Sequence, residues 1–167
     1  MTLRMCIAAL ACLLVLCTEG RTQTSENSLP ITPAAEISAA LNAAPEREGP
    51  APATPDGVPH QQLNQNAPLA MVQALTASAI PLPGIKFAPT PFSLAGSLGW
   101  RLDPDFAEGP DEGFIRGTLE FGHQHRVEDG SMHLLLPSEF STIALEKGWG
   151  VIHPIDDTIS GETSTYV

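Results

Sequence analysis

The chain has 167 residues, of which 8 are lysine or arginine and 19 are aspartate or glutamate, so its formal net charge is −11. This length allows one modest domain with appended segments. Because the chain is acidic and has no basic run, nucleic acids and anionic membrane surfaces are excluded as favoured partners.

The first predicted element is an apolar N-terminal segment. Arg4 precedes an apolar run from Cys6 to Cys17, and Thr18, Glu19 and Gly20 follow it. A run of about 12 residues is too short to span the hydrocarbon layer of a bilayer as a helix. We therefore expect residues 1–20 to be a secretory signal peptide and the protein to be secreted or otherwise exported. A retained membrane anchor is the alternative.

The cysteines restrict the chemistry of the exported form. All three, Cys6, Cys12 and Cys17, lie in the expected signal peptide. A chain cut near Gly20 would retain none of them, so disulfides, cysteine nucleophiles and cysteine-bound zinc are excluded for it.

Residues 21–66 have the composition of a linker. They are rich in proline, alanine, serine, threonine, glutamine and asparagine, and they contain no phenylalanine, tryptophan or tyrosine. Such a segment buries too little apolar surface to offset the entropy lost on ordering. The sequence therefore predicts a disordered linker that is rich in proline and alanine.

Residues 67–167 carry the patterns of a folded α+β domain. Apolar residues at helical spacing predict one helix that has Asn66 as its N-cap and ends before Pro81, and a second helix over residues 138–147. Gly148 follows the second helix as its expected C-terminal stop. Trp149 is then expected to anchor the core after that helix.

A β-hairpin is predicted between these two helices. Alternating apolar and polar residues indicate strands over residues 114–126 and 131–136, with turn residues at Asp129 and Gly130. The fold class that follows is α+β, with a small antiparallel β-sheet and one or two packed helices.

The hairpin contains three of the chain's five histidines. His123 and His125 share a strand face, so they point to the same side. Whether His133 joins them depends on the turn, because one residue of register shift moves a side chain to the other face. A two-residue turn would place His125 opposite Leu134, whereas a three-residue turn, which is odd in length, would place it opposite His133. We favour the odd turn, with Gly130 in a left-handed position, which also places Leu135 opposite His123.

Three roles are open for these histidines. They are buried structural residues, residues that bind a substrate or transfer its proton, or ligands of a metal ion. A cupin-like metal site is the least favoured reading. Gly117 and the His-x-His pair fit the first cupin motif, but Asp129 and Gly130 stand where its glutamate would lie.

A longer block carries a more specific resemblance. The stretch "EFGHQHRVEDGSMHLLLPSEFSTIALEKGWGVIHP" resembles the luciferase-domain family, which includes the luciferase of luminous fungi. The resemblance covers residues 113–154, and its pattern falls on these positions: Glu120, His123, His125, Ser131, His133, Leu134, Leu136, Gly148, Trp149, Gly150, His153 and Pro154. Family members usually continue with a further strand and a closing helix, so we expect residues 67–167 to form a C-terminally incomplete luciferase-like domain.

The resemblance implies a cofactor-independent oxygenase or a domain that binds a small molecule. The fungal luciferase oxidises a hydroxylated pyrone with molecular oxygen and uses no organic cofactor. The resemblance therefore implies a small aromatic or pyrone-like substrate, molecular oxygen as a second substrate, and no cofactor. It also implies a histidine-lined site formed by His123, His125, His133 and His153. The alternative is a non-catalytic, degenerate relative that acts as a structural or interaction protein.

Overall fold

The structure is a computed structural model that describes residues 32–108, 110–115, 117–126 and 128–167. The expected signal peptide, residues 1–20, and the first part of the expected linker, residues 21–31, lie outside the described residues. Within the described ranges, no helix has both the length and the apolar character needed to cross a membrane.

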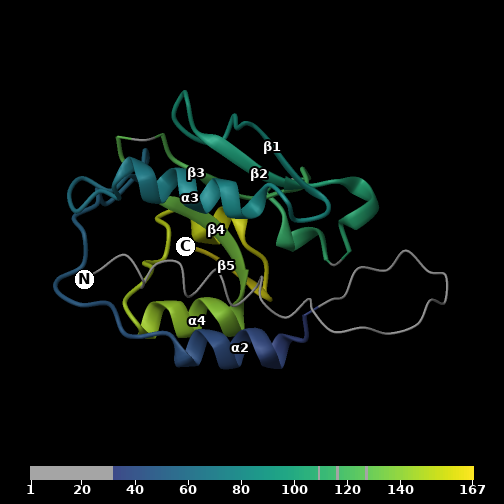
Figure 1. The fold of residues 1–167 in the computed structure, drawn as a ribbon, viewed down its shortest axis with the longest axis horizontal. Helices are drawn as coiled ribbons and strands as arrows, with labels where there is room; N and C mark the ends of the chain where they lie inside the picture. The colour runs from purple at the N-terminus through teal and green to yellow at the C-terminus, as the bar shows by residue number, and fades with distance from the viewer. Residues whose placement is uncertain (1–31, 109, 116, 127) are drawn as a thin grey trace.

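The centre of the fold is an antiparallel sheet in which every strand pairs with its sequence neighbour (Figure 1). This order confirms the predicted α+β class. The strands are β1 (Ile85–Pro89), β2 (Leu98–Leu102), β3 (Glu120–Gln124), β4 (Met132–Pro137) and β5 (Ser164–Tyr166).

Helices lie on both sides of this sheet. In Figure 1, α3 runs along the upper side and a pair formed by α2 and α4 runs along the lower side. The Thr76 hydroxyl of α3 donates a hydrogen bond of 2.7 Å to Gln124 of β3. The helical elements are α2 (Ala34–Ala43), α3 (Leu69–Ala79), α4 (Ser138–Glu146), α5 (Asp156–Ile159) and two short 3-10 turns, η1 (Pro104–Phe106) and η2 (Asp111–Gly113).

The ends of the two expected helices are set by local residues. Gly148 has a φ of +73°, a left-handed conformation that glycine adopts without a steric penalty, and so it ends α4 as predicted. The start of α3 differs from the expectation, because Pro68 rather than Asn66 occupies the N-cap position.

Strand β3 is shorter than the sequence predicted. It begins at Glu120 rather than near residue 114, because the preceding chain folds back on itself. The Ile115 N–H donates to the Glu120 carbonyl at 2.7 Å, and Gly117 takes a φ of +70° within that reversal. The reversal buries Ile115 completely in the apolar core beside Leu135 and Tyr166.

The hairpin register places all three of its histidines on one face. His123 pairs with His133, and the His125 N–H donates to the Ser131 carbonyl at 2.8 Å. The predicted odd-length connection is therefore right, and Gly130 has the expected positive φ, at +73°. The predicted partners were wrong by two positions, since His133 lies opposite His123 rather than His125.

The longer connection explains this register. The N–H groups of Asp129 and Gly130 both donate to the carbonyl of Arg126. These groups are satisfied within the connection, so the β-ladder does not extend toward Asp129 and Gly130.

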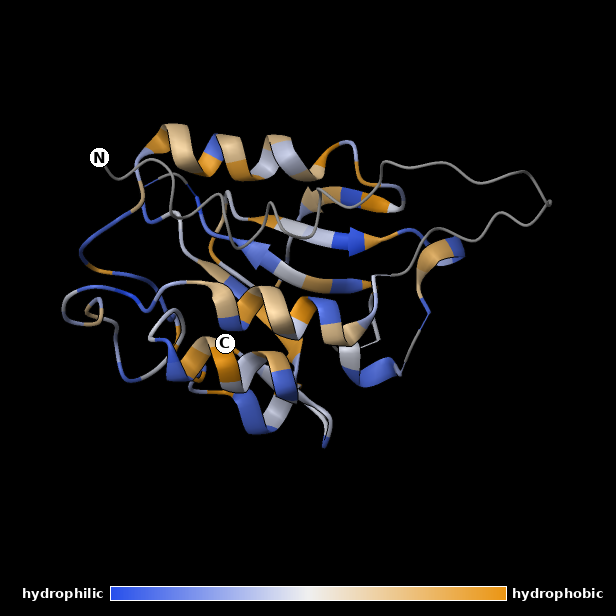
Figure 2. Cartoon of the chain, turned by 60° about the horizontal axis from the view of Figure 1, so that its bottom comes forward, coloured by the Kyte–Doolittle hydropathy of each residue, from blue (hydrophilic) through white to orange (hydrophobic). Residues whose placement is uncertain are grey.

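The second half of the expected linker is a defined strap. We use this name for residues 44–66, most of which are hydrophilic and lie on the left in Figure 2. The Lys147 ammonium donates to the Ala44 carbonyl at 2.6 Å, and the Arg47 N–H donates to the Lys147 carbonyl at 2.8 Å. Residues 32–66 thus differ from the disorder expected of them. Composition alone underestimates the order of a polar segment when hydrogen bonds to the adjacent folded domain hold that segment in place.

A substitution in β3 tests this sheet packing. A β-carbon on Gly122 would lie 2.5 Å from the His133 carbonyl oxygen and 2.6 Å from a methyl carbon of Leu134. We expect Gly122→Ala to lower the free energy of unfolding by about 2 kcal/mol, since backbone must shift to relieve the overlap. Urea unfolding measures this loss. The control is Gly113→Ala, whose β-carbon meets no atom within 4 Å. An equal loss in both variants would contradict the register.

Candidate functional site

Five histidines form one buried cluster around His133. The ring centroid of His133 lies 4.4 Å from that of His153, 4.5 Å from that of His125, 5.1 Å from that of His123 and 5.6 Å from that of His60. The most exposed of the five, His60, retains 8% of its surface. Below, "the histidine cluster" means these five residues.

The sheet positions three members of the cluster. Side chains two residues apart in a strand point to the same side, so His123 and His125 share a face of β3. His133 joins them from β4 through its direct pairing with His123. These three predicted site residues are therefore brought together by the hairpin alone.

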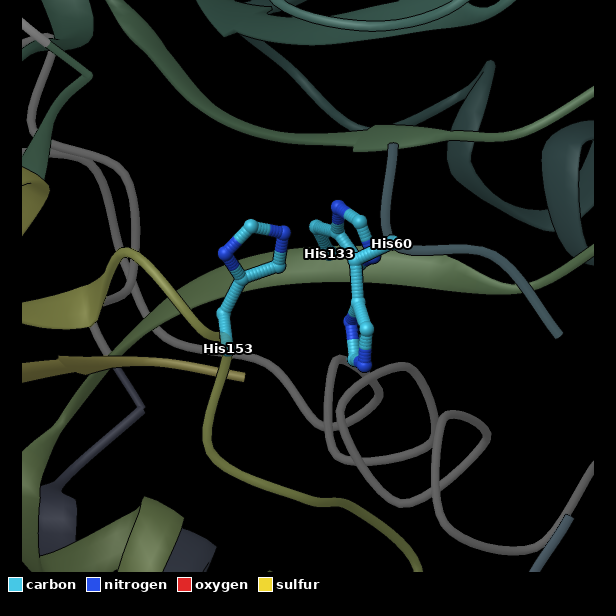
Figure 3. A group of neighbouring side chains, drawn as sticks. All are labelled: His60, His133 and His153. Atoms are coloured by element: carbon cyan, nitrogen blue, oxygen red, sulfur yellow. The ribbon is translucent and has the colours of Figure 1, made fainter. Parts of the chain in front are cut away.

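The fourth predicted residue, His153, comes from the segment after α4. Its backbone N–H donates to the Tyr166 carbonyl at 2.9 Å, which ties this segment to β5. Figure 3 shows the side chain of His153 reaching toward His133 and His60. Tyr166 itself lies against the cluster, with its ring centroid 4.6 Å from that of His153.

The fifth member, His60, was missed by the sequence analysis because it lies in the strap. Its ring contacts His133 and also His153, at 4.9 Å between centroids. The nearby Gln62 N–H donates to the Asp129 carboxylate at 3.3 Å. The local sequence around His60 is polar and aperiodic, so no pattern signalled its position.

A carboxylate orients His125. The Nδ1 of His125 is hydrogen-bonded to the Asp129 carboxylate, which also accepts from the Ser131 N–H. Burial raises the pKa of Asp129, but the hydrogen bonds from His125 and Ser131 outweigh it and hold the pKa below its usual value. Asp129 is therefore ionised, and His125 uses its Nδ1–H to donate. In the neutral tautomer that carries its proton on Nδ1, the lone pair of His125 lies on Nε2.

A second buried carboxylate lies beside His123. Glu120 is fully buried and accepts two hydrogen bonds from Arg101, at 3.1 and 3.2 Å, and one of 2.6 Å from Thr90. Burial raises the pKa of Glu120, but interactions with His123, Thr90 and Arg101 lower it overall. The nearest Glu120 oxygen is 3.3 Å from the Nδ1 of His123.

His123 is the least satisfied polar group of the cluster. The contact with Glu120 has the distance of an ion pair but not the geometry of a hydrogen bond, and the Nε2 has no hydrogen-bond partner among the described residues. A buried nitrogen without a partner is rare and costs about 1–3 kcal/mol. Such a group marks a place where a proton, an ion or a substrate atom would be favourable.

Three histidines of the cluster, His60, His133 and His153, are held uncharged. Burial lowers the pKa of His133 to about 2 and that of His153 to about 4, and repulsion by neighbouring imidazoles adds to each effect. Burial also lowers the pKa of His60 and raises that of the Tyr166 phenol. At neutral pH these three histidines and Tyr166 are therefore uncharged.

The comparison with known families falls on the same part of the chain. Residues 118–162 match the family model described as Luciferase domain. This luciferase-domain segment confirms the resemblance predicted over residues 113–154. It supplies four of the five clustered histidines, and His60 lies outside it. No curated protein and no solved structure matches the chain.

One residue of the luciferase-domain pattern has a different position from the one predicted. Trp149 was expected in the core, but it is 41% exposed, and its indole N–H donates to the Pro45 carbonyl at 2.7 Å. It fastens the strap to the luciferase-domain segment. Trp149 follows the left-handed Gly148 at the end of α4, and this turn directs its side chain toward the strap.

The arrangement has two chemical capacities. Lone pairs on the hairpin histidines accept a proton or bind an ion, whereas His153 acts as a donor. The Ile155 N–H donates to the Nδ1 of His153 at 3.3 Å, so the neutral His153 ring carries its proton on Nε2. Two sets of three histidines have ligand nitrogens close enough to share a metal ion: His60, His133 and His153, and His123, His125 and His133.

Proposed function

We propose that this protein is an oxygen-dependent enzyme that acts on a small hydroxylated aromatic or pyrone-like molecule and uses no organic cofactor. The observation that carries the proposal is the meeting of four histidines of the luciferase-domain segment in one buried cluster. Burial of several polar rings without full hydrogen bonding destabilises the fold, so a purely structural role accounts poorly for it.

The proposed reaction begins with loss of a proton from the substrate hydroxyl. The Nε2 of His125 accepts it, and the Asp129 carboxylate stabilises the imidazolium that forms. The enolate is electron-rich and reacts with molecular oxygen, so a new carbon–oxygen bond forms and the oxygen is reduced to a peroxide. The peroxide anion takes the proton back from His125, and the product is substrate plus one dioxygen molecule.

His153 has the complementary role in this proposal. Its Nε2–H donates to the oxygen that carries negative charge after the proton is lost. Because His60 packs against His133 and His153, part of the strap must move to admit the substrate. The strap would then cover the reacting atoms and exclude water.

Oxygen uptake tests the proposal. We expect the full chain to consume oxygen when it is mixed with members of a panel of hydroxylated pyrones and catechols. We expect His125→Ala to slow uptake by about 100-fold or more, since removal of a general base has effects of that order. An oxygen electrode measures uptake, and mass spectrometry measures the mass added to the product. Lys86→Ala, at an exposed position on β1, is the matched control.

Two outcomes would contradict the proposal. Uptake that is unchanged in folded His125→Ala would remove this residue from the chemistry. Binding of a panel compound without oxygen uptake would identify a domain that binds a small molecule and does not catalyse the reaction. Circular dichroism of each variant separates loss of activity from loss of fold.

A further inference from the structure

We propose that His123, His125 and His133 bind a divalent transition-metal ion. One ring nitrogen from each of them lies within 4.8 Å of the other two. Bonds of about 2.0–2.1 Å to a tetrahedral ion place ligand nitrogens about 3.4 Å apart. Small side-chain rotations therefore close the set around one ion, and the paired strands β3 and β4 hold all three residues.

The surroundings of His125 resemble the second shell of a metal ligand. Histidine ligands commonly donate their other ring N–H to a carboxylate, which fixes the tautomer and makes the free nitrogen more basic. The Nδ1 of His125 has this partner in Asp129, and Asp129 is itself held by N–H groups of Ser131 and Gln62. The lone pair of His125 is thus left on Nε2.

The unpartnered nitrogen of His123 is an independent observation. His123 is completely buried, and its Nε2 has no hydrogen-bond partner among the described residues. A bound ion would satisfy this nitrogen without any rearrangement of the sheet. Glu120 lies on the opposite side of the ring, near Nδ1, where it would act on His123 as Asp129 acts on His125.

The other set, His60, His133 and His153, is less suited to an ion. The Nδ1 of His153 accepts the Ile155 N–H, so its Nε2 carries a proton and offers no lone pair. His60 also comes from the strap rather than from the paired strands. The inference therefore commits to the hairpin set, and the other set supplies matched controls.

The ligand atoms restrict the type of ion. Three imidazoles suit Zn²⁺, Fe²⁺, Cu²⁺ or Ni²⁺, whereas Mg²⁺ and Ca²⁺ prefer oxygen ligands. Three protein ligands also leave a coordination position open for water, oxygen or a substrate atom. The inference deepens the proposed function. The binding of oxygen or a substrate atom at the open position rests on that proposed function. With the ion present, a substrate hydroxyl at the open position would have a lowered pKa and would release its proton to water, and His125 would serve as a ligand instead of a base.

Metal titration of the full chain tests the inference. The purified protein is first stripped with a chelator, then titrated with Zn²⁺ by calorimetry and with Co²⁺ by visible absorption. We expect about one ion per chain, with the intense absorption of low-symmetry Co²⁺. We expect His123→Ala and His125→Ala to weaken binding by about 100-fold or more, and Asp129→Asn by about 10- to 100-fold.

The control variants are His60→Ala and His153→Ala, for which we expect binding within about threefold of the original protein, because neither residue supplies a ligand to the hairpin set. Absence of binding by the original chain would overturn the inference. Loss of binding in the controls but not in His123→Ala would also overturn it, since the ion would then occupy the other set. If His123→Ala does not fold, His123→Gln replaces it.

The metal titration and the oxygen-uptake assay can refute the metal site and the proposed function independently of each other. An ion bound without oxygen uptake would refute the proposed function and leave the metal site standing. Oxygen uptake by chelator-stripped protein would keep the proposed function and remove the ion from it.

Discussion

Replacement of Arg101 by alanine is expected to lower the free energy of unfolding by about 3 kcal/mol, because it leaves a buried charge without its main partner. The carboxylate of Glu120 is fully buried, and two nitrogens of Arg101 bind the same carboxylate oxygen at 3.1 and 3.2 Å. Only the hydrogen bond from Thr90 and the nearby His123 ring would remain. Urea unfolding at pH 7.5 measures the change.

Two further variants make this prediction specific. Lys86→Ala removes an exposed ion pair with Asp103, at 3.5 Å, and is expected to cost less than about 1 kcal/mol. The double variant Arg101→Ala, Glu120→Gln is expected to recover part of the loss, because it removes the stranded charge. If the double variant is no more stable than Arg101→Ala, lost packing of the arginine side chain explains the effect instead.

The Arg101–Glu120 pair also connects the sheet to the histidine cluster. Glu120 begins β3, and the ladder between β2 and β3 shifts register between Trp100 and Arg101. Arg101 thereby pairs with Glu120, and Glu120 lies beside the His123 ring. A loss of this pair is therefore expected to disturb His123 as well as the stability of the sheet.

The sequence predicted the hairpin site because its signals are local. Strand alternation placed His123 and His125 on one face, and Gly130 indicated a connection with a left-handed residue. The family resemblance added His153, which lies far along the chain from the hairpin. The fine register was not predictable, because it depends on hydrogen bonds within the connection that compete with the ladder.

The contribution of the strap was not predictable from composition. His60 and Gln62 lie in a polar, aperiodic segment, which usually indicates disorder. The position of the strap depends on single contacts with distant residues, such as the contact of Gln62 with Asp129 and that of Pro45 with Trp149. Residue patterns report periodic burial against a core, whereas these contacts are isolated, so each is visible only once the domain is folded.

Acid is expected to destabilise the metal-free protein well above the pH at which carboxylates titrate. In the unfolded chain a histidine has a pKa of about 6.5, so it gains a proton as the pH falls through that value. In the folded chain the pKa of His133 is about 2 and that of His153 about 4, so both stay neutral at pH 5.5. The unfolded state then binds more protons than the folded state, and stability falls as the pH falls.

The size of this effect follows from the same linkage. Between pH 7.5 and 5.5, each histidine that stays neutral only when folded lowers the free energy of unfolding by about 1.4 kcal/mol. His133 and His153 together predict a loss of about 3 kcal/mol, and His60, whose pKa is also lowered, adds to it. The lowered pKa values of Glu120 and Asp129 act with the same sign, but mainly below about pH 4.5.

Urea unfolding at pH 7.5 and 5.5, with a chelator present so that no ion contributes, measures this loss. The variant His153→Gln cannot gain the proton in either state. Its loss of unfolding free energy between pH 7.5 and 5.5 should therefore be smaller by the contribution of one histidine, about 1.4 kcal/mol. Nearby carboxylates oppose the lowering of the histidine pKa values only in part. Asp156 raises the pKa of His153 and Asp129 raises that of His60, but burial and the other histidines outweigh them. Equal stability of the original chain at the two pH values would mean that the histidine cluster is hydrated or opens to accept protons in the folded state.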